Sequence, residues 1–287
     1  MAVYKQDSAS ADSDPEVDEP PDPSREKMAA FIGYRAFPPV MNLYGNLSGI
    51  VSALTTLKLC GASESDLVYL VELHFGFTPR GPLNFGRGYY LRNGTTMQDP
   101  VLAAAGDNFP LPLVVSLFSS ETVVLLPPLD TEKNPRDMVT EVMRSSASKE
   151  QGVAFRFAVE VGVQRWRREE FEWRKMKKGD GDEKGSRYTL FRIPFGLSGA
   201  ASSSSTPVLE ESSQIVAEVV FRNILSMKHI CTLELKGAGL TGELGERWIL
   251  MVVMTVLGLY WMRQNGRTKR ATVAVAEKMH EKQVSKG

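Results

Sequence analysis

Residues 237–270 read GAGLTGELGERWILMVVMTVLGLYWMRQNGRTKR, and the architecture of the rest of the chain depends on what this stretch forms. It opens with a G-x-G-x-x-G motif, continues through fifteen residues without a charge at 248–262, and ends in a basic segment. The motif is typical of a dinucleotide-binding turn. A charge-free run of this length is typical of either a short membrane anchor or a helix buried in a protein core.

The glycine motif, Gly237, Gly239 and Gly242, lies between a predicted strand at 227–236 and a predicted helix, as a nucleotide-binding turn requires. However, apolar and polar residues alternate in that strand, whereas the first strand of a dinucleotide-binding fold is buried on both faces. The helix after the motif is apolar on every side, whereas a crossover helix has a polar face. We therefore interpret the motif as a bend from strand into helix. A nucleotide-binding enzyme is the third alternative.

The charge-free run is short for a membrane span. Fifteen helical residues cover about 22 Å, whereas a bilayer core is about 30 Å thick. Aromatic residues at its two ends and the bases beyond it do resemble a membrane interface. That orientation would export the 247 residues before the run, yet the acidic start MAVYKQDSASADSD is unlike a signal peptide. A core helix is expected, and an integral membrane protein held by a single C-terminal transmembrane helix at 248–262 is the alternative.

The preceding sequence predicts many short strands. In 153–164, VAFRFAVEVGVQ, apolar residues recur at every second position, which indicates an antiparallel strand with one buried side. Similar strands are predicted at 112–118, 169–176, 187–193, 213–223 and 227–236, among nine to twelve in all. A helix that is apolar all round needs an apolar wall all round, and a closed barrel supplies one. The predicted fold is mainly β, a closed antiparallel β-barrel of about twelve strands around a hydrophobic C-terminal α-helix.

Composition divides the chain into four parts. Residues 1–27 hold eight acids against three bases and few large apolar groups, so they are expected to be a disordered acidic leader. Residues 28–87 are expected to be a poorly defined N-terminal extension, in which 66–77 has the composition of a strand. The barrel is expected at 88–262 with its central helix at 243–262, and a basic tail at 263–287.

Three stretches resemble the tubby C-terminal-like superfamily, which includes tubby proteins, phospholipid scramblases and LURP-one-related proteins. They are LRNGTTMQDPVLAAAG at 91–106, RREEFEWRKM at 167–176 and GAGLTGELGERW at 237–248. The resemblance covers residues 88–262 and implies a roughly twelve-stranded barrel threaded by a helix, in an uncharacterised branch. The calcium-site and cysteine-rich segments of scramblases are not evident, so lipid scrambling is not inferred.

Seven bases in 165–178 make up a candidate site for anionic lipids, here called the basic patch. They are Arg165, Arg167, Arg168, Arg174, Lys175, Lys177 and Lys178, with Trp166 and Trp173 between them. Tubby domains bind phosphoinositides, so the resemblance implies a lipid-binding role for these bases. The alternative is a solvated strand face on which Glu169, Glu170 and Glu172 neutralise the charge. The tail bases at 263–270 are a second candidate membrane-surface element.

No catalytic, cofactor or metal site is predicted. The three histidines are far apart, no hydrolase or phosphate-loop motif occurs, and Cys60 and Cys231 do not have metal-site spacing. The formal net charge is zero, so nucleic acid is not an expected partner. We expect a non-enzymatic cytoplasmic binding or scaffold protein that associates with anionic phospholipids at a membrane surface. The predicted buried residues of the central helix are Trp248, Ile249, Leu250, Val252, Val253, Val256, Leu257, Tyr260 and Trp261.

Overall fold

The computed structural model describes eleven segments of the chain. They are residues 33–46, 55–78, 81–107, 121–130, 132–133, 136–148, 152–163, 165–176, 185–193, 215–223 and 228–284. The predicted acidic leader, the predicted strand at 112–118, and Lys177 and Lys178 of the basic patch lie outside these residues.

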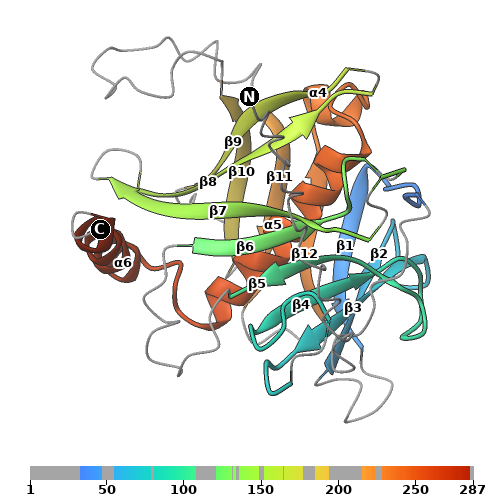
Figure 1. Cartoon of the computed structure of the whole chain (residues 1–287), viewed down its shortest axis with the longest axis horizontal. Helices are drawn as coiled ribbons and strands as arrows, with labels where there is room; N and C mark the ends of the chain where they lie inside the picture. The colour runs from blue at the N-terminus through green and yellow to red at the C-terminus, as the bar shows by residue number, and fades with distance from the viewer. Residues whose placement is uncertain are drawn as a thin grey trace, which may run out of the picture.

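Twelve strands form a closed barrel, which confirms the predicted fold class (Figure 1). Each strand pairs antiparallel with its neighbours in sequence, and β1 pairs with β12 to close the sheet. The strands are β1 Val40–Gly45, β2 Thr56–Cys60, β3 Leu67–His74, β4 Gly88–Arg92, β5 Val101–Gly106, β6 Glu121–Leu126, β7 Val139–Ser148, β8 Gly152–Val161, β9 Arg167–Lys175, β10 Ser186–Ile193, β11 Ile215–Phe221 and β12 His229–Leu235.

The barrel begins at Val40, so the expected boundary at residue 88 is corrected. Strands β1, β2 and β3 all come from the segment expected to be a poorly defined extension, and only β3 coincides with a stretch singled out there. In β1, Met41 and Leu43 are buried in the main core. Strands of five or six residues contain too few alternations to be distinguished from an irregular segment by period alone.

The strand alternation builds the inner wall. In β8, Val153, Phe155, Phe157, Val159 and Val161 are buried in the core, while Arg156 is exposed. Such alternation is what one buried side requires of an antiparallel strand. The opposite faces of the strands carry most of the charged side chains.

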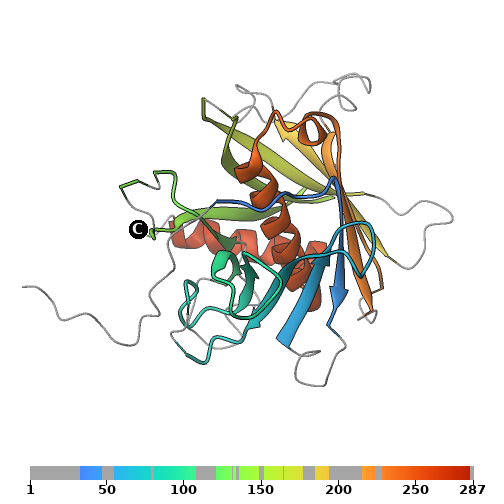
Figure 2. The same cartoon turned by 90° about the vertical axis from the view of Figure 1, so that its right-hand side faces the viewer.

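Helix α5, Glu246–Gln264, runs through the middle of this wall (Figure 2). Every side chain from Trp248 to Met262 is buried except Ile249, which is half-buried against the core. The helix starts three residues later than the predicted 243. Among the described helices, none combines the length and apolar character needed to cross a membrane.

The glycine motif forms the bend that joins β12 to α5. The short helix α4, Gly237–Leu240, occupies its first half, and β12 lies between two antiparallel neighbours rather than in a parallel sheet. A Cβ at Gly239 would lie 2.4 Å from the Val216 carbonyl oxygen and 2.5 Å from the Trp248 ring. Gly239 is therefore needed for close packing of the bend against β11 and α5.

The predicted basic tail contains a third helix, α6 Arg270–Val284. Val273 and Ala276 are buried, and Glu277 Oε2 accepts a hydrogen bond from the Ala147 amide of β7 at 3.4 Å. Because successive strands are antiparallel, the barrel has two distinct ends. The end with α4 and the β8–β9 connection is called the α4 end. The end where α5 leaves the barrel, with the β3–β4 and β9–β10 connections, is called the α6 end.

Candidate functional site

The structure divides the basic patch between the two ends of the barrel. Arg165, Arg167 and Arg168 lie at the α4 end, where β9 begins, whereas Arg174 and Lys175 lie at the α6 end, where β9 finishes. A nine-residue strand spans about 27 Å. The described residues of the patch therefore do not form a single surface.

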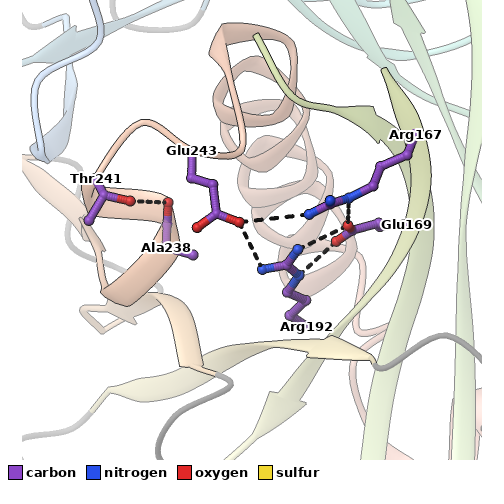
Figure 3. A network of polar contacts seen from close by, with 6 residues as sticks. All are labelled: Arg167, Glu169, Arg192, Ala238, Thr241 and Glu243. Carbon is purple, nitrogen blue, oxygen red and sulfur yellow. Dashed lines mark hydrogen bonds and ion pairs between the residues drawn. The ribbon is translucent and has the colours of Figure 1, made fainter. Parts of the chain in front are cut away.

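Arg167 belongs to an ion-pair network at the α4 end (Figure 3). Arg192 of β10 lies between two carboxylates, with Nε 2.7 Å from Glu169 Oε2 and Nη1 3.5 Å from Glu243 Oε1. Arg167 pairs with the same two carboxylates. Burial alone would raise the pKa of Glu169, but hydrogen bonds from Arg192 and Arg167 lower it below its usual value. The network holds β9, β10 and the α4–α5 connection together.

Arg168 is paired even more closely. Its guanidinium lies 2.5 Å from Glu141 Oε2 and 2.6 Å from Glu160 Oε1. Glu160 also accepts from Arg247 Nε of α5 at 3.2 Å, so the same cluster joins the barrel wall to its central helix. Arg247 Nη1 in turn donates to the Pro127 carbonyl at 2.7 Å. The charges of Arg168 and Arg247 are therefore paired with groups of the barrel itself.

Arg174, near the other end of β9, is also neutralised. Its Nε donates to Glu172 at 2.7 Å, and its guanidinium lies 4.4 Å from the ring centroid of Phe191. Glu172 is buried and accepts a second bond from Arg156 at 2.6 Å. For Arg167, Arg168 and Arg174, the geometry matches the alternative of a neutralised strand face.

Two patch residues have no carboxylate partner within the described part of the chain, Arg165 and Lys175. Arg165 is exposed in the β8–β9 connection beside Trp166, which is 48% exposed. The other tryptophan of the patch, Trp173, is buried and donates its indole N–H to Thr255 Oγ1 of α5 at 3.0 Å. Trp173 is therefore a core residue.

Lys175 lies at the α6 end beside Arg263, the base in the last turn of α5. Lys175 is on the same face of β9 as the buried Phe171 and Trp173, and it pairs in register with Tyr188. Partial burial and then the Arg263 charge lower the pKa of Lys175. Burial also lowers the pKa of Arg263. The ring of Tyr188 contacts that of Phe221 with centroids 5.8 Å apart, and Arg263 lies over the same Phe221 ring, so both positive charges lie at this part of the barrel mouth.

Arg263 is held in place by contacts that leave its charge uncompensated. Its guanidinium lies 4.5 Å from the Phe221 ring centroid, and Nη2 donates to the Arg222 carbonyl at 3.3 Å. No ion pair joins Arg263 or Lys175 to a carboxylate of the described segments. Lys269 and Arg270, both exposed, follow at the same end. The sequence marked these bases separately, but only barrel closure around α5 brings Arg263 to Lys175.

The thiols and imidazoles take part in structural contacts. Burial raises the pKa of Cys60 to about 11 and that of Cys231 to about 12, so neither is a thiolate at neutral pH. Burial and the Arg222 charge lower the pKa of His229, which stacks on Tyr44 with ring centroids 4.9 Å apart. Nowhere in the described segments do three or more potential metal ligands of the His, Cys, Asp or Glu type come together.

The fold resembles what the tubby-like interpretation implies, but it does not test that interpretation by itself, because a fold can carry unrelated functions. Comparison with known proteins found no matching family model, no matching curated protein and no matching solved structure.

Proposed function

We propose that this chain is a non-enzymatic cytoplasmic binding protein that associates with anionic phospholipid surfaces through the α6 end of its barrel. The observation that supports the proposal is the position of Lys175 and Arg263 around the contacting rings of Tyr188 and Phe221, with no carboxylate of the described segments paired to either base. We also propose that the chain is a divergent tubby-like protein of the LURP-one-related kind. The closed barrel around an apolar helix is compatible with that membership without being diagnostic of it.

The physical argument concerns uncompensated charge. A base near an anionic membrane surface contributes about 1 kcal/mol of attraction. An arginine paired with two carboxylates, such as Arg168, contributes little, because those carboxylates are repelled by the same surface. Lys175, Arg263, Lys269 and Arg270 are all at the α6 end, so the attraction would orient the barrel with this end toward the lipid.

The test is a comparison of two double variants with the same change in charge. Lys175→Gln/Arg263→Gln removes two charges at the α6 end, and Arg165→Gln/Arg136→Gln removes two exposed charges at the α4 end. Binding to phosphatidylcholine vesicles with and without phosphatidylserine is measured by cosedimentation. The first variant should bind phosphatidylserine vesicles about thirtyfold more weakly than the wild type. The second should bind like the wild type.

Near-ultraviolet circular dichroism checks that each variant keeps its tertiary structure. Equal binding by the wild type and the Lys175/Arg263 variant would refute the orientation. A loss confined to the Arg165/Arg136 variant would assign the lipid surface to the α4 end instead. If phosphatidylserine does not increase the binding of the wild type to vesicles, the proposed function is wrong.

A further inference from the structure

The β3–β4 connection exposes three phenylalanines, here called the aromatic tip. Phe75 is 43% exposed, Phe77 84% and Phe85 45%. The rings of Phe75 and Phe77 stack with centroids 6.3 Å apart. Single exposed apolar residues are common on protein surfaces, but clustered large aromatic side chains mark interaction sites.

The described residues of the connection that carries the aromatic tip make buried contacts with the barrel. The buried His74 Nε2 lies 2.5 Å from the Asn84 carbonyl oxygen, and the His74 ring stacks on Tyr90 at 4.9 Å. Leu83 packs with Tyr90 and Ala104 in a small second core. The connection therefore has buried contacts of its own, and the three phenylalanines are left outside them.

Two glycines allow close backbone packing next to the aromatic tip. Gly76 has φ +74°, and a Cβ there would lie 2.3 Å from the Phe85 carbonyl oxygen. A Cβ at Gly86 would lie 2.1 Å from the Asp107 carbonyl oxygen, at the end of β5. The backbone at Gly76, between Phe75 and Phe77, is thus held directly against that of Phe85.

Side-chain contacts connect the aromatic tip to the exit of α5. Arg87, two residues after Phe85, has its guanidinium 5.9 Å from the ring centroid of Trp261. Trp261 donates its indole N–H to Asp107 at 3.1 Å. Arg263 follows Trp261 by two residues in the last turn of α5. The aromatic tip and the uncompensated bases therefore belong to the same end of the barrel.

We propose that the aromatic tip inserts into the bilayer to which the α6 end binds, an inference that rests on the proposed function. The aromatic tip projects from the connection between two strands, and Lys175 and Arg263 at its end of the barrel are bases without a carboxylate partner among the described residues. An anionic bilayer offers a partner for both features, with phosphates for the bases and hydrocarbon for the rings. Stable attachment of a peripheral protein generally needs two such signals together.

The test removes the aromatic side chains while leaving the charges unchanged. Phe77→Ser/Phe85→Ser is compared with Val163→Ser/Trp166→Ser, which removes exposed apolar groups at the α4 end. The aromatic-tip variant should bind phosphatidylserine-containing vesicles at least tenfold more weakly. As salt is added, its residual binding should be lost at a lower salt concentration than the binding of the wild type, because salt screens the electrostatic attraction that remains. The control variant should match the wild type in both respects.

Insertion depth is measured with an environment-sensitive fluorophore on Thr78→Cys, beside Phe77. Its emission should shift to the blue on vesicle binding, and lipids brominated in their acyl chains should quench it. The same label on Ser63→Cys, exposed in the β2–β3 connection at the α4 end, should do neither. Cys60 and Cys231 are buried with raised pKa values, so the introduced cysteine is the one that reacts in the folded protein.

Each outcome separates insertion from the proposed function. If the aromatic-tip variant binds vesicles as the wild type does while Lys175→Gln/Arg263→Gln does not, insertion is wrong and the electrostatic proposal stands. A water-exposed label at residue 78 in the bound protein would likewise overturn insertion. If the wild type does not bind these vesicles, both proposals fail. If light scattering shows that the aromatic-tip variant dissociates a dimer, the aromatic tip is a contact between copies of the chain.

Discussion

Trp173 and Thr255 connect the barrel wall to the helix inside it. The indole N–H of Trp173 donates to Thr255 Oγ1 at 3.0 Å, and that hydroxyl donates to the Val252 carbonyl at 2.8 Å. Thr255 is fully buried in an otherwise apolar helix, so its hydroxyl has a specific structural role. A buried polar group that keeps its partner is nearly neutral for stability, whereas one that loses its partner is costly.

Thr255→Val should therefore lower the free energy of unfolding by about 1–3 kcal/mol, because Trp173 would keep a buried N–H without an acceptor. Urea unfolding followed by tryptophan fluorescence measures the change. Thr255→Ser retains the hydroxyl and serves as the control for the hydrogen bond, apart from the loss of one methyl group. Equal stability of the valine variant and the wild type would show that the indole finds another acceptor.

At the scale of the element, α5 was predictable and the composition of its wall only partly so. The charge-free run predicted the helix, and long alternating segments such as β8 predicted strands with one buried face. Strands β1 and β2 were missed because five or six residues carry too little periodic signal. The extent of the basic patch could not be predicted, because a sequence does not show where a charged side chain lies or which carboxylate it contacts. Arg167 and Lys175 occupy opposite ends of β9, and Arg168 pairs with Glu141 of β7.

The α4–α5 bend offers a prediction that distinguishes packing from backbone conformation. Gly239→Ala places a methyl group against the Val216 carbonyl and the Trp248 ring. It should lower the free energy of unfolding by about 1–3 kcal/mol. Gly242→Ala meets no atom within 4 Å, but its φ of +78° is strained for alanine, and it should cost about 1 kcal/mol. Thermal and urea unfolding of both variants give the comparison. A smaller loss for Gly239→Ala than for Gly242→Ala would contradict the packing described for this bend.

At the scale of the whole molecule, helix and barrel depend on each other. Burial of about ten large apolar side chains of α5 contributes about 15–30 kcal/mol before conformational entropy is counted. Net stabilities of folded domains are only about 5–15 kcal/mol. The buried pair Arg267–Asp107, with nitrogen and oxygen 2.5 Å apart, joins the chain after α5 back to the end of β5. Loss of α5 would also expose the apolar inner faces of the strands to water, so the barrel should not keep its fold without the helix.

A chain ending at Glu246 should consequently aggregate or lose its near-ultraviolet circular dichroism, while the full chain purifies without detergent and elutes as a folded species. Size-exclusion chromatography and circular dichroism of the two chains provide the measurement. If the shorter chain folds and the full chain needs detergent, the result would instead support the alternative of a membrane anchor at 248–262. Both chains must keep residues 40–74, because these residues contain β1, β2 and β3.

The pairing of β1 with β12 also has a consequence for protein synthesis. Met41 pairs with Leu233, so a ribosome finishes the partner of the first strand only after about 190 further residues. At the usual rates of translation this takes about 10–40 s. Throughout that interval the nascent sheet has two unpaired edges, and its interior helix has not yet been made. A ribosome that stalls before α5 leaves a nascent sheet with open edges and an exposed apolar face, which is prone to aggregate. Rapid elongation, or a chaperone bound to that face until the last helix emerges, would reduce this tendency.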